Sequence, residues 1–128
     1  MLEELLRDIL NEDNILISVS TGGAIIEMRV NRELPFRVSE NWITIGDNKG
    51  PCHMHINSKE VDQVRFVREE KQQRTSYSIR LMNAKGERLI AAFFTKMSGE
   101  DGKPIRERVE RYEQLFRKYG AREIIELR

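Results

Sequence analysis

The stretch TSYSIRLMNAKGERLIAAFF, residues 75–94, decides the fold. Its first part alternates apolar with polar side chains, which is the period of a half-buried strand. The apolar positions are Tyr77, Ile79 and Leu81. Residues 83–86, NAKG, are typical of a tight turn, and residues 89–94 are apolar on both faces, which indicates the most central strand of a sheet. Strands joined by so short a connection are antiparallel neighbours.

Further strands are predicted upstream of this hairpin. They cover residues 15–20, 26–30, 42–45, 52–56 and 64–69. The first two flank Thr21-Gly22-Gly23, where glycine accepts the positive φ of a tight turn. The next two flank a loop rich in glycine, asparagine and aspartate. With the two strands of residues 75–94, these segments predict about seven strands.

Two helices enclose the strand-rich region. Near the N-terminus, apolar residues recur at the spacing of an amphipathic helix; they are Leu2, Leu5, Leu6, Ile9 and Leu10. A longer helix is predicted to begin with Pro104 at its first position and to end at Gly120, which suits a C-terminal cap. Residues 121–128 fit either a short strand or an extension of this helix. The order predicts one α+β domain over residues 1–128, with an antiparallel, meander-like sheet and both helices packed on one side.

The overall composition excludes several classes of protein. Lys and Arg number 22 and Asp and Glu 21, a net charge of +1, which is unlike the strong basic excess of a nucleic-acid-binding protein. No apolar run is long enough to cross a membrane, and the N-terminus lacks the pattern of a signal peptide. We therefore expect a cytoplasmic protein without nucleic-acid or membrane partners. A single cysteine excludes an intramolecular disulfide.

Both histidines of the chain lie in GPCHMHIN, residues 50–57. If this segment is a strand, His53 and His55 share one face. Two imidazoles in this arrangement can hold one metal ion, but a structural zinc needs four ligands, so a partner chain or a cofactor would have to complete the site. The alternative is that both histidines simply lie on a solvated strand face.

Other residues offer weaker hypotheses. Cys52 and His53 are adjacent, and adjacent strand residues point apart, so they do not form a nucleophile–base pair. Hydrolase, P-loop and dinucleotide-binding motifs are absent, and the sequence does not favour an enzyme, although it leaves the question open. Trp42 is either a core residue or a flat platform for a ring. Basic residues around one hairpin form either an anion site or a solvated face; they are Arg65, Arg68, Lys71, Arg74 and Arg80.

Several short motifs between Trp42 and Met97 follow one another in the order of a known family. The matching pieces are Trp42 and Asp47, Met54-His55-Ile56, residues 64–68 (VRFVR), Thr75-Ser76, and Gly86 with Phe93-Phe94-Thr95-Lys96. In this order they resemble the repeat unit of the haem-utilisation proteins of the HemS/ChuX type. HemS-type chains contain two such units, whereas ChuX-type chains contain one and form a homodimer. The resemblance therefore implies a single ChuX-like unit with a haem-iron-utilisation fold, which pairs with a second copy.

The resemblance also implies a ligand and a set of residues that bind it. The family binds haem, and His55 matches its iron-ligating histidine. Lys96 and Arg68 match cations that can neutralise the haem propionates. His53 has no counterpart and is predicted to be a second ligand or an outer-shell group. The chain departs from the pattern near Thr21-Gly22-Gly23, where the ChuX branch carries another histidine.

Three functional hypotheses follow. The first is a homodimeric carrier of haem or a related tetrapyrrole, with His55 as the iron ligand. The second is a binding or regulatory module that kept the fold without haem and holds another anionic small molecule, or a protein, through the arginine-rich hairpin. The third is a mononuclear metal site at His53 and His55, completed across a dimer interface.

Overall fold

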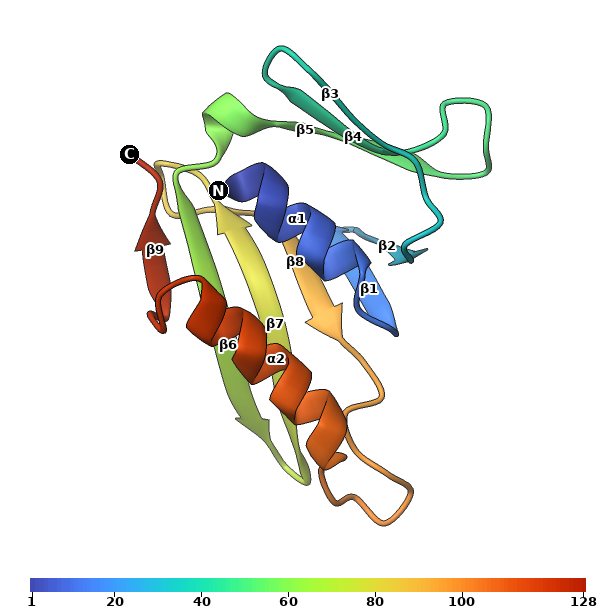
Figure 1. Ribbon diagram of the computed structural model, residues 1–128, viewed down its shortest axis with the longest axis vertical. Coiled ribbons are helices and arrows are strands. Elements are labelled where there is room, and N and C mark those ends of the chain that lie inside the picture. Colours follow the sequence, from blue (N-terminus) through green and yellow to red (C-terminus); the bar gives the residue numbers. More distant parts are fainter.

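A six-stranded antiparallel sheet forms the body of the protein (Figure 1). The computed structural model describes all residues 1–128. The strand order in this sheet is β2-β1-β8-β7-β6-β9. The strands are β1 (Ile15–Ser20), β2 (Ile25–Val30), β6 (Gln63–Lys71), β7 (Arg74–Met82), β8 (Arg88–Phe94) and β9 (Ile124–Glu126). The β7–β8 hairpin lies at the centre, as its apolar sequence predicts.

A second, three-stranded sheet lies at one end of the large sheet (Figure 1). It consists of β3 (Phe36–Ser39), β4 (Trp42–Gly46) and β5 (His53–Asn57), and the single 3-10 turn Ser58–Glu60 follows it. The chain thus has nine strands in two sheets, rather than about seven in one meander. The two additional strands, β3 and β9, have four and three residues. Such short strands carry too few alternating positions to be recognised from sequence.

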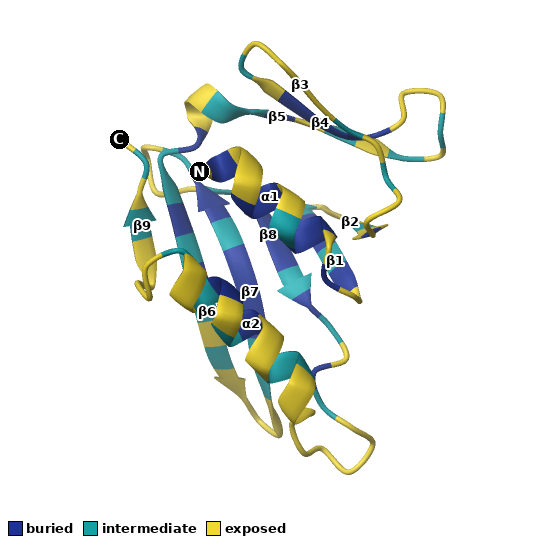
Figure 2. Ribbon diagram, viewed as in Figure 1, coloured by how far each residue is buried: buried dark blue, intermediate teal, exposed yellow.

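Both helices cover the same face of the large sheet (Figure 1). They are α1 (Leu2–Leu10) and α2 (Arg106–Lys118), and their inward sides are buried, as Figure 2 shows. This arrangement confirms the predicted α+β class. Neither helix has the length and apolar character needed to cross a bilayer. The residues after α2 form β9, antiparallel to β6, which decides between the two alternatives for the C-terminal tail.

The start of α2 differs from the sequence prediction. Pro104 precedes the helix instead of occupying its first position, and Ile105 is the N-cap with an extended backbone. The Ile105 amide donates a hydrogen bond to the Met97 carbonyl at 2.8 Å, which holds this residue in the extended conformation. The predicted end is correct, since Gly120 follows the C-cap with a φ of +104°.

Tyr112 of α2 lies at the centre of the core. Its side chain is 1% exposed, and its ring makes edge-on contacts with Phe66, Tyr77 and Phe94 at centroid distances of 5.8, 5.1 and 5.1 Å. Its hydroxyl donates to the carbonyl oxygen of Ser78 at 2.9 Å. Burial raises the pKa of the Tyr112 phenol above its ordinary value, since the charged form would lose its hydration. Tyr112 therefore joins α2 to the middle of the sheet by packing and by a hydrogen bond.

An ion pair between a buried carboxylate and a half-exposed arginine connects the two helices. Glu12, just after α1, is 6% exposed, and the Arg111 guanidinium donates to both of its carboxylate oxygens at 2.9 and 2.7 Å. The hydrogen bond to Glu12 raises the pKa of Arg111 above its ordinary value. This two-point contact fixes the relative placement of α1 and α2.

Candidate functional site

The close approach of β4 and β5 depends on one glycine. Gly46 lies opposite His53 in the antiparallel register and has a φ of +100°. A β-carbon at Gly46 would lie 2.6 Å from the Cys52 carbonyl oxygen, which is far inside van der Waals contact. Only glycine therefore allows β5 to approach β4 at this point.

His53 and His55 point to the same, exposed face of β5, as their spacing predicts. Their ring centroids are 5.2 Å apart. Ile56 points the other way and is 5% exposed within the main core cluster. The strand thus places its apolar side against the core and both imidazoles toward solvent.

A hydrogen bond fixes the His55 ring. Thr44 faces His55 across the β4–β5 ladder, and Thr44 Oγ1 lies 2.8 Å from His55 Nδ1. When Nδ1 carries the proton and donates to the threonine oxygen, Nε2 presents a free lone pair. An imidazole oriented by such a bond is the usual form of a histidine metal ligand. His55 therefore has an orienting partner that sequence spacing alone does not reveal.

Trp42 lies on the same face as these residues. It is two positions from Thr44 on β4, so both side chains project to one side of the sheet, and it is 46% exposed. The interpretation of Trp42 as a core residue is therefore wrong, and the alternative of an exposed flat platform agrees with the structure. We call the row formed by the exposed Trp42, His53 and His55 and the buried Thr44 the histidine face.

A metal ion on this face would need ligands from elsewhere. The chain contains no cluster of three or more His, Cys, Asp or Glu side chains that could hold a metal. Cys52 is a free, half-buried thiol beside His53. Two imidazoles alone leave most coordination positions of a transition metal open, so within one protomer the histidine face suits a cofactor that brings its own metal and equatorial ligands.

Arg68 lies away from the histidine face. Its guanidinium pairs with Glu113 of α2 at 2.9 Å and lies over the rings of Tyr77 and Tyr112, 5.5 and 5.7 Å from their centroids. Arg68 is thus on the helix-covered side of the large sheet and already has an acidic partner.

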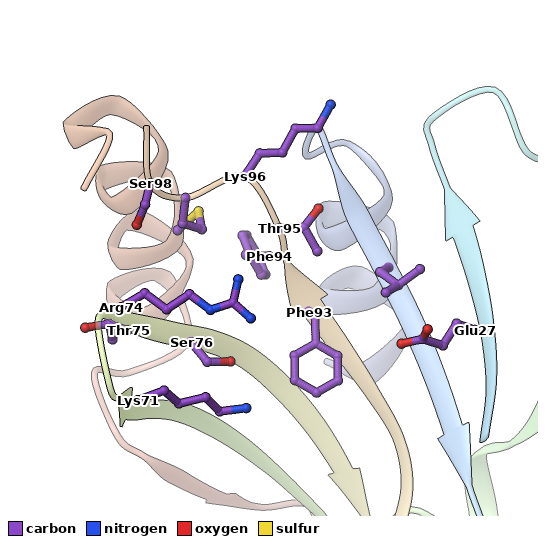
Figure 3. A pocket seen from close by; sticks show the side chains of 12 residues that line it. Glu27, Lys71, Arg74, Thr75, Ser76, Phe93, Phe94, Thr95, Lys96 and Ser98 are labelled. Carbon is purple, nitrogen blue, oxygen red and sulfur yellow. The ribbon is translucent and has the colours of Figure 1, made fainter. Parts of the chain in front are cut away.

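Lys96 follows β8 and lines a different site. Its backbone has a φ of +56°, and it borders a cavity of about 300 Å³ together with Lys71 and Arg74 (Figure 3). No histidine lines this cavity. In Figure 1, β5 crosses one end of the long axis, and β8 ends well down that axis. The structure therefore brings His53 and His55 together but places Lys96 and Arg68 apart from them.

The basic hairpin divides into two groups. Arg80 forms an ion pair with Glu69 and a hydrogen bond to Ser78, and Arg65 donates twice to Gln63. Lys71 and Arg74, at the hairpin tip, join Lys96 in the cavity instead. Sequence alone predicts one basic hairpin, because the distinction depends on which face and which end of the strands each residue occupies.

Comparisons with known proteins agree with this fold. A protein-family model matches residues 3–120. The match to the structure of the haem-binding protein ChuX covers 91% of this chain and 70% of that chain, with a TM-score of 0.73 and 13% identity. The chain matches the protein AGR_C_4470 from Agrobacterium tumefaciens over 89% of its own length and 62% of that chain, with a TM-score of 0.67 and 24% identity. No curated protein matches the sequence.

A longer haem-binding protein contains the same fold. The chain matches holo-PhuS from Pseudomonas aeruginosa with a TM-score of 0.66 and 16% identity, over 88% of its own length and 31% of PhuS. The fold, and a match that covers nearly the whole length of this chain, define a single α+β unit of the haem-utilisation type. The chain belongs to the haem-utilisation family of the HemS/ChuX type.

Proposed function

We propose that the protein is a cytoplasmic, homodimeric carrier of haem or a related tetrapyrrole, with His55 as the iron ligand and His53 in support. The observation that carries the proposal is the hydrogen bond of 2.8 Å between Thr44 Oγ1 and His55 Nδ1, on an exposed strand face. It orients a ring nitrogen outward in a chain whose structural neighbours include haem-binding proteins.

The chemistry of the histidine face fits haem better than a bare metal ion. Haem supplies four equatorial nitrogens, so one imidazole is enough to complete a five-coordinate iron. The exposed Trp42 indole offers an apolar surface on the same face of the small sheet as His55, and such a surface packs against a flat ring. When bound, haem would supply the iron chemistry, and His55 would hold its iron while the rest of this chain controls access to it.

Propionate contacts at Lys96 and Arg68 remain part of the proposal. Lys96 follows β8, whose end lies well away from β5 along the molecule (Figure 1), so we place Lys96 against a haem held by His55 of the other protomer. Arg68 already binds the Glu113 carboxylate at 2.9 Å, and a haem propionate would take the place of that carboxylate. A homodimer is therefore the assembly in which these residues can serve one haem.

A hemin titration tests the iron ligand. We expect a saturable Soret change of one haem per protomer, lost in His55→Ala and retained in His53→Ala, because only His55 has an orienting partner. Thr44→Val, which removes that partner, should weaken binding about tenfold or more. An identical, non-saturating response in wild type and His55→Ala would refute the proposal.

Sedimentation tests the assembly independently. At micromolar concentration without hemin, we expect a species of twice the 15.1 kDa chain mass, because the family's single-unit members work as pairs. Sedimentation at the mass of one chain would contradict the homodimer and leave Lys96 without a route to the haem.

A non-haem binding module of the same fold is the second candidate. The observation that favours it is the cationic cavity at Lys71, Arg74 and Lys96, which contains no histidine. The lack of a histidine near Thr21-Gly22-Gly23, at the β1–β2 turn, also favours it.

A further inference from the structure

The cavity beside β8 combines cationic and apolar groups. Figure 3 shows Lys71 and Arg74 extending from the β6–β7 hairpin toward Phe93, whose ring lies on the cavity floor, while the Lys96 ammonium points away at the rim. Leu16 and Met97 add apolar surface, and the cavity measures about 300 Å³. Such a space can accept a flat apolar group with a charged head at the hairpin tip.

The cations that line this cavity have no acidic partner. None of the ion pairs in the structure includes Lys71, Arg74 or Lys96. Glu27 is the only acid among the residues that line the cavity. Lys71 and Arg74, two unpaired cations that extend into one cavity with Lys96 at its rim, form a local positive site in a chain whose net charge is only +1.

The strand register places two of these cations directly opposite each other. Lys71 faces Arg74 across the β6–β7 ladder, and like charges in this position destabilise a sheet. Arg65 and Arg80 also face each other, but Arg80 forms an ion pair with Glu69, and Arg65 donates to the neutral amide oxygen of Gln63. A bound anion would offset the repulsion between Lys71 and Arg74 at the hairpin tip.

We propose that this cavity binds an amphiphilic carboxylate, with the carboxylate on Lys71 and Arg74 and a flat apolar body against Phe93. Arginine offers a two-pronged donor to a carboxylate, and lysine adds a point charge. The hydroxyl group of Ser76 also lines the cavity and supplies a further donor, whereas the Thr95 hydroxyl already donates to the Asn14 carbonyl oxygen at 2.6 Å. This site is separate from the histidine face. If the carboxylate belongs to a tetrapyrrole, the inference deepens the proposed function; if it belongs to a free aromatic acid, it goes beyond that function.

The first experiment uses 2-naphthoate, a flat aromatic carboxylate, with neutral 2-naphthamide as the matched ligand. Isothermal titration of the full chain should show saturable binding of naphthoate at one site per protomer and at least tenfold weaker binding of naphthamide. The variant Lys71→Gln/Arg74→Gln should weaken naphthoate binding about tenfold or more, because two charged contacts are lost. If naphthoate binds, an equal affinity of the wild type for naphthoate and naphthamide, or an equal affinity of wild type and variant for naphthoate, would overturn the inference.

Two control variants locate the effect. Lys59→Gln/Lys85→Gln removes the same charge from residues that do not line the cavity and should leave naphthoate affinity unchanged. His55→Ala should also leave it unchanged, which separates this test from that of the iron ligand. A loss of affinity in Lys59→Gln/Lys85→Gln equal to that in the cavity variant would reduce the effect to net charge and overturn the inference. Thermal unfolding of Lys71→Gln/Arg74→Gln should show no loss of stability, because a like-charge pair is removed.

Metal-free protoporphyrin IX distinguishes the two sources of the carboxylate. Binding of protoporphyrin that is weakened by Lys71→Gln/Arg74→Gln, without binding of naphthoate, assigns the cavity to tetrapyrrole carboxylates. Binding of naphthoate with the same dependence assigns it to free aromatic acids. If neither compound binds in a way that depends on Lys71 and Arg74, the cavity is not an anion site.

Discussion

Replacing Tyr112 by alanine should lower the free energy of unfolding by about 3–5 kcal/mol, the range found when a large aromatic side chain is removed from a core. Tyr112 is 1% exposed and contacts Phe66, Tyr77 and Phe94. No neighbouring side chain can fill the volume, because these rings are held on three separate strands. Urea unfolding monitored by circular dichroism measures the change.

Tyr112→Phe separates packing from hydrogen bonding. It keeps the ring and removes only the hydroxyl that donates to Ser78 at 2.9 Å, so we expect a loss of about 1 kcal/mol. If Tyr112→Ala and Tyr112→Phe cost the same, the hydrogen bond rather than the aromatic cluster would hold α2 on the sheet.

Gly46→Ala is the second change with a large expected effect. The new side chain would sit on a left-handed backbone with a φ of +100°, and its β-carbon would lie 2.6 Å from the Cys52 carbonyl oxygen. Because both effects destabilise the folded state, we expect the free energy of unfolding to fall by about 2–4 kcal/mol. The clash moves β5 away from β4, and the contact between Thr44 and His55 should be lost with it. Hemin affinity should therefore fall together with stability.

Gly86→Ala is the matched control. Gly86 also has a positive φ, +79°, but nothing lies within 4 Å of a β-carbon placed there. We expect a loss of about 1 kcal/mol, from backbone conformation alone, with hemin affinity unchanged. Equal losses of stability in the two glycine variants would show that the close approach to Cys52 has no energetic weight.

The parts of the fold that depend on local periodicity were predictable from sequence. The alternation in residues 75–94 predicts the central hairpin, and the spacing of the α1 leucines predicts their burial. The same reasoning places His53 and His55 on one strand face. In each case the sequence repeat and the buried face have the same period, so no information about distant residues is needed.

The parts that depend on distant contacts were not predictable. Trp42 is exposed because the core lies on the other side of β4, and the sequence does not say which side that is. The cavity gathers Leu16, Lys71 and Lys96 from segments far apart in the chain. The role of Thr44 follows from the β4–β5 register, which a loop of several residues leaves open from sequence.

No backbone hydrogen bond joins the two sheets. The three-stranded sheet is attached through its apolar side, where Ile43, Ile45 and Ile56 belong to the same core cluster as the α1 leucines, and Arg7 of α1 lies 4.2 Å from the ring centroid of Phe36. Apolar packing has no preferred direction. A shift of the histidine-bearing sheet over α1 would therefore break no ladder, and we expect the height and tilt of the imidazoles to adjust to a ligand while the six-stranded sheet stays unchanged.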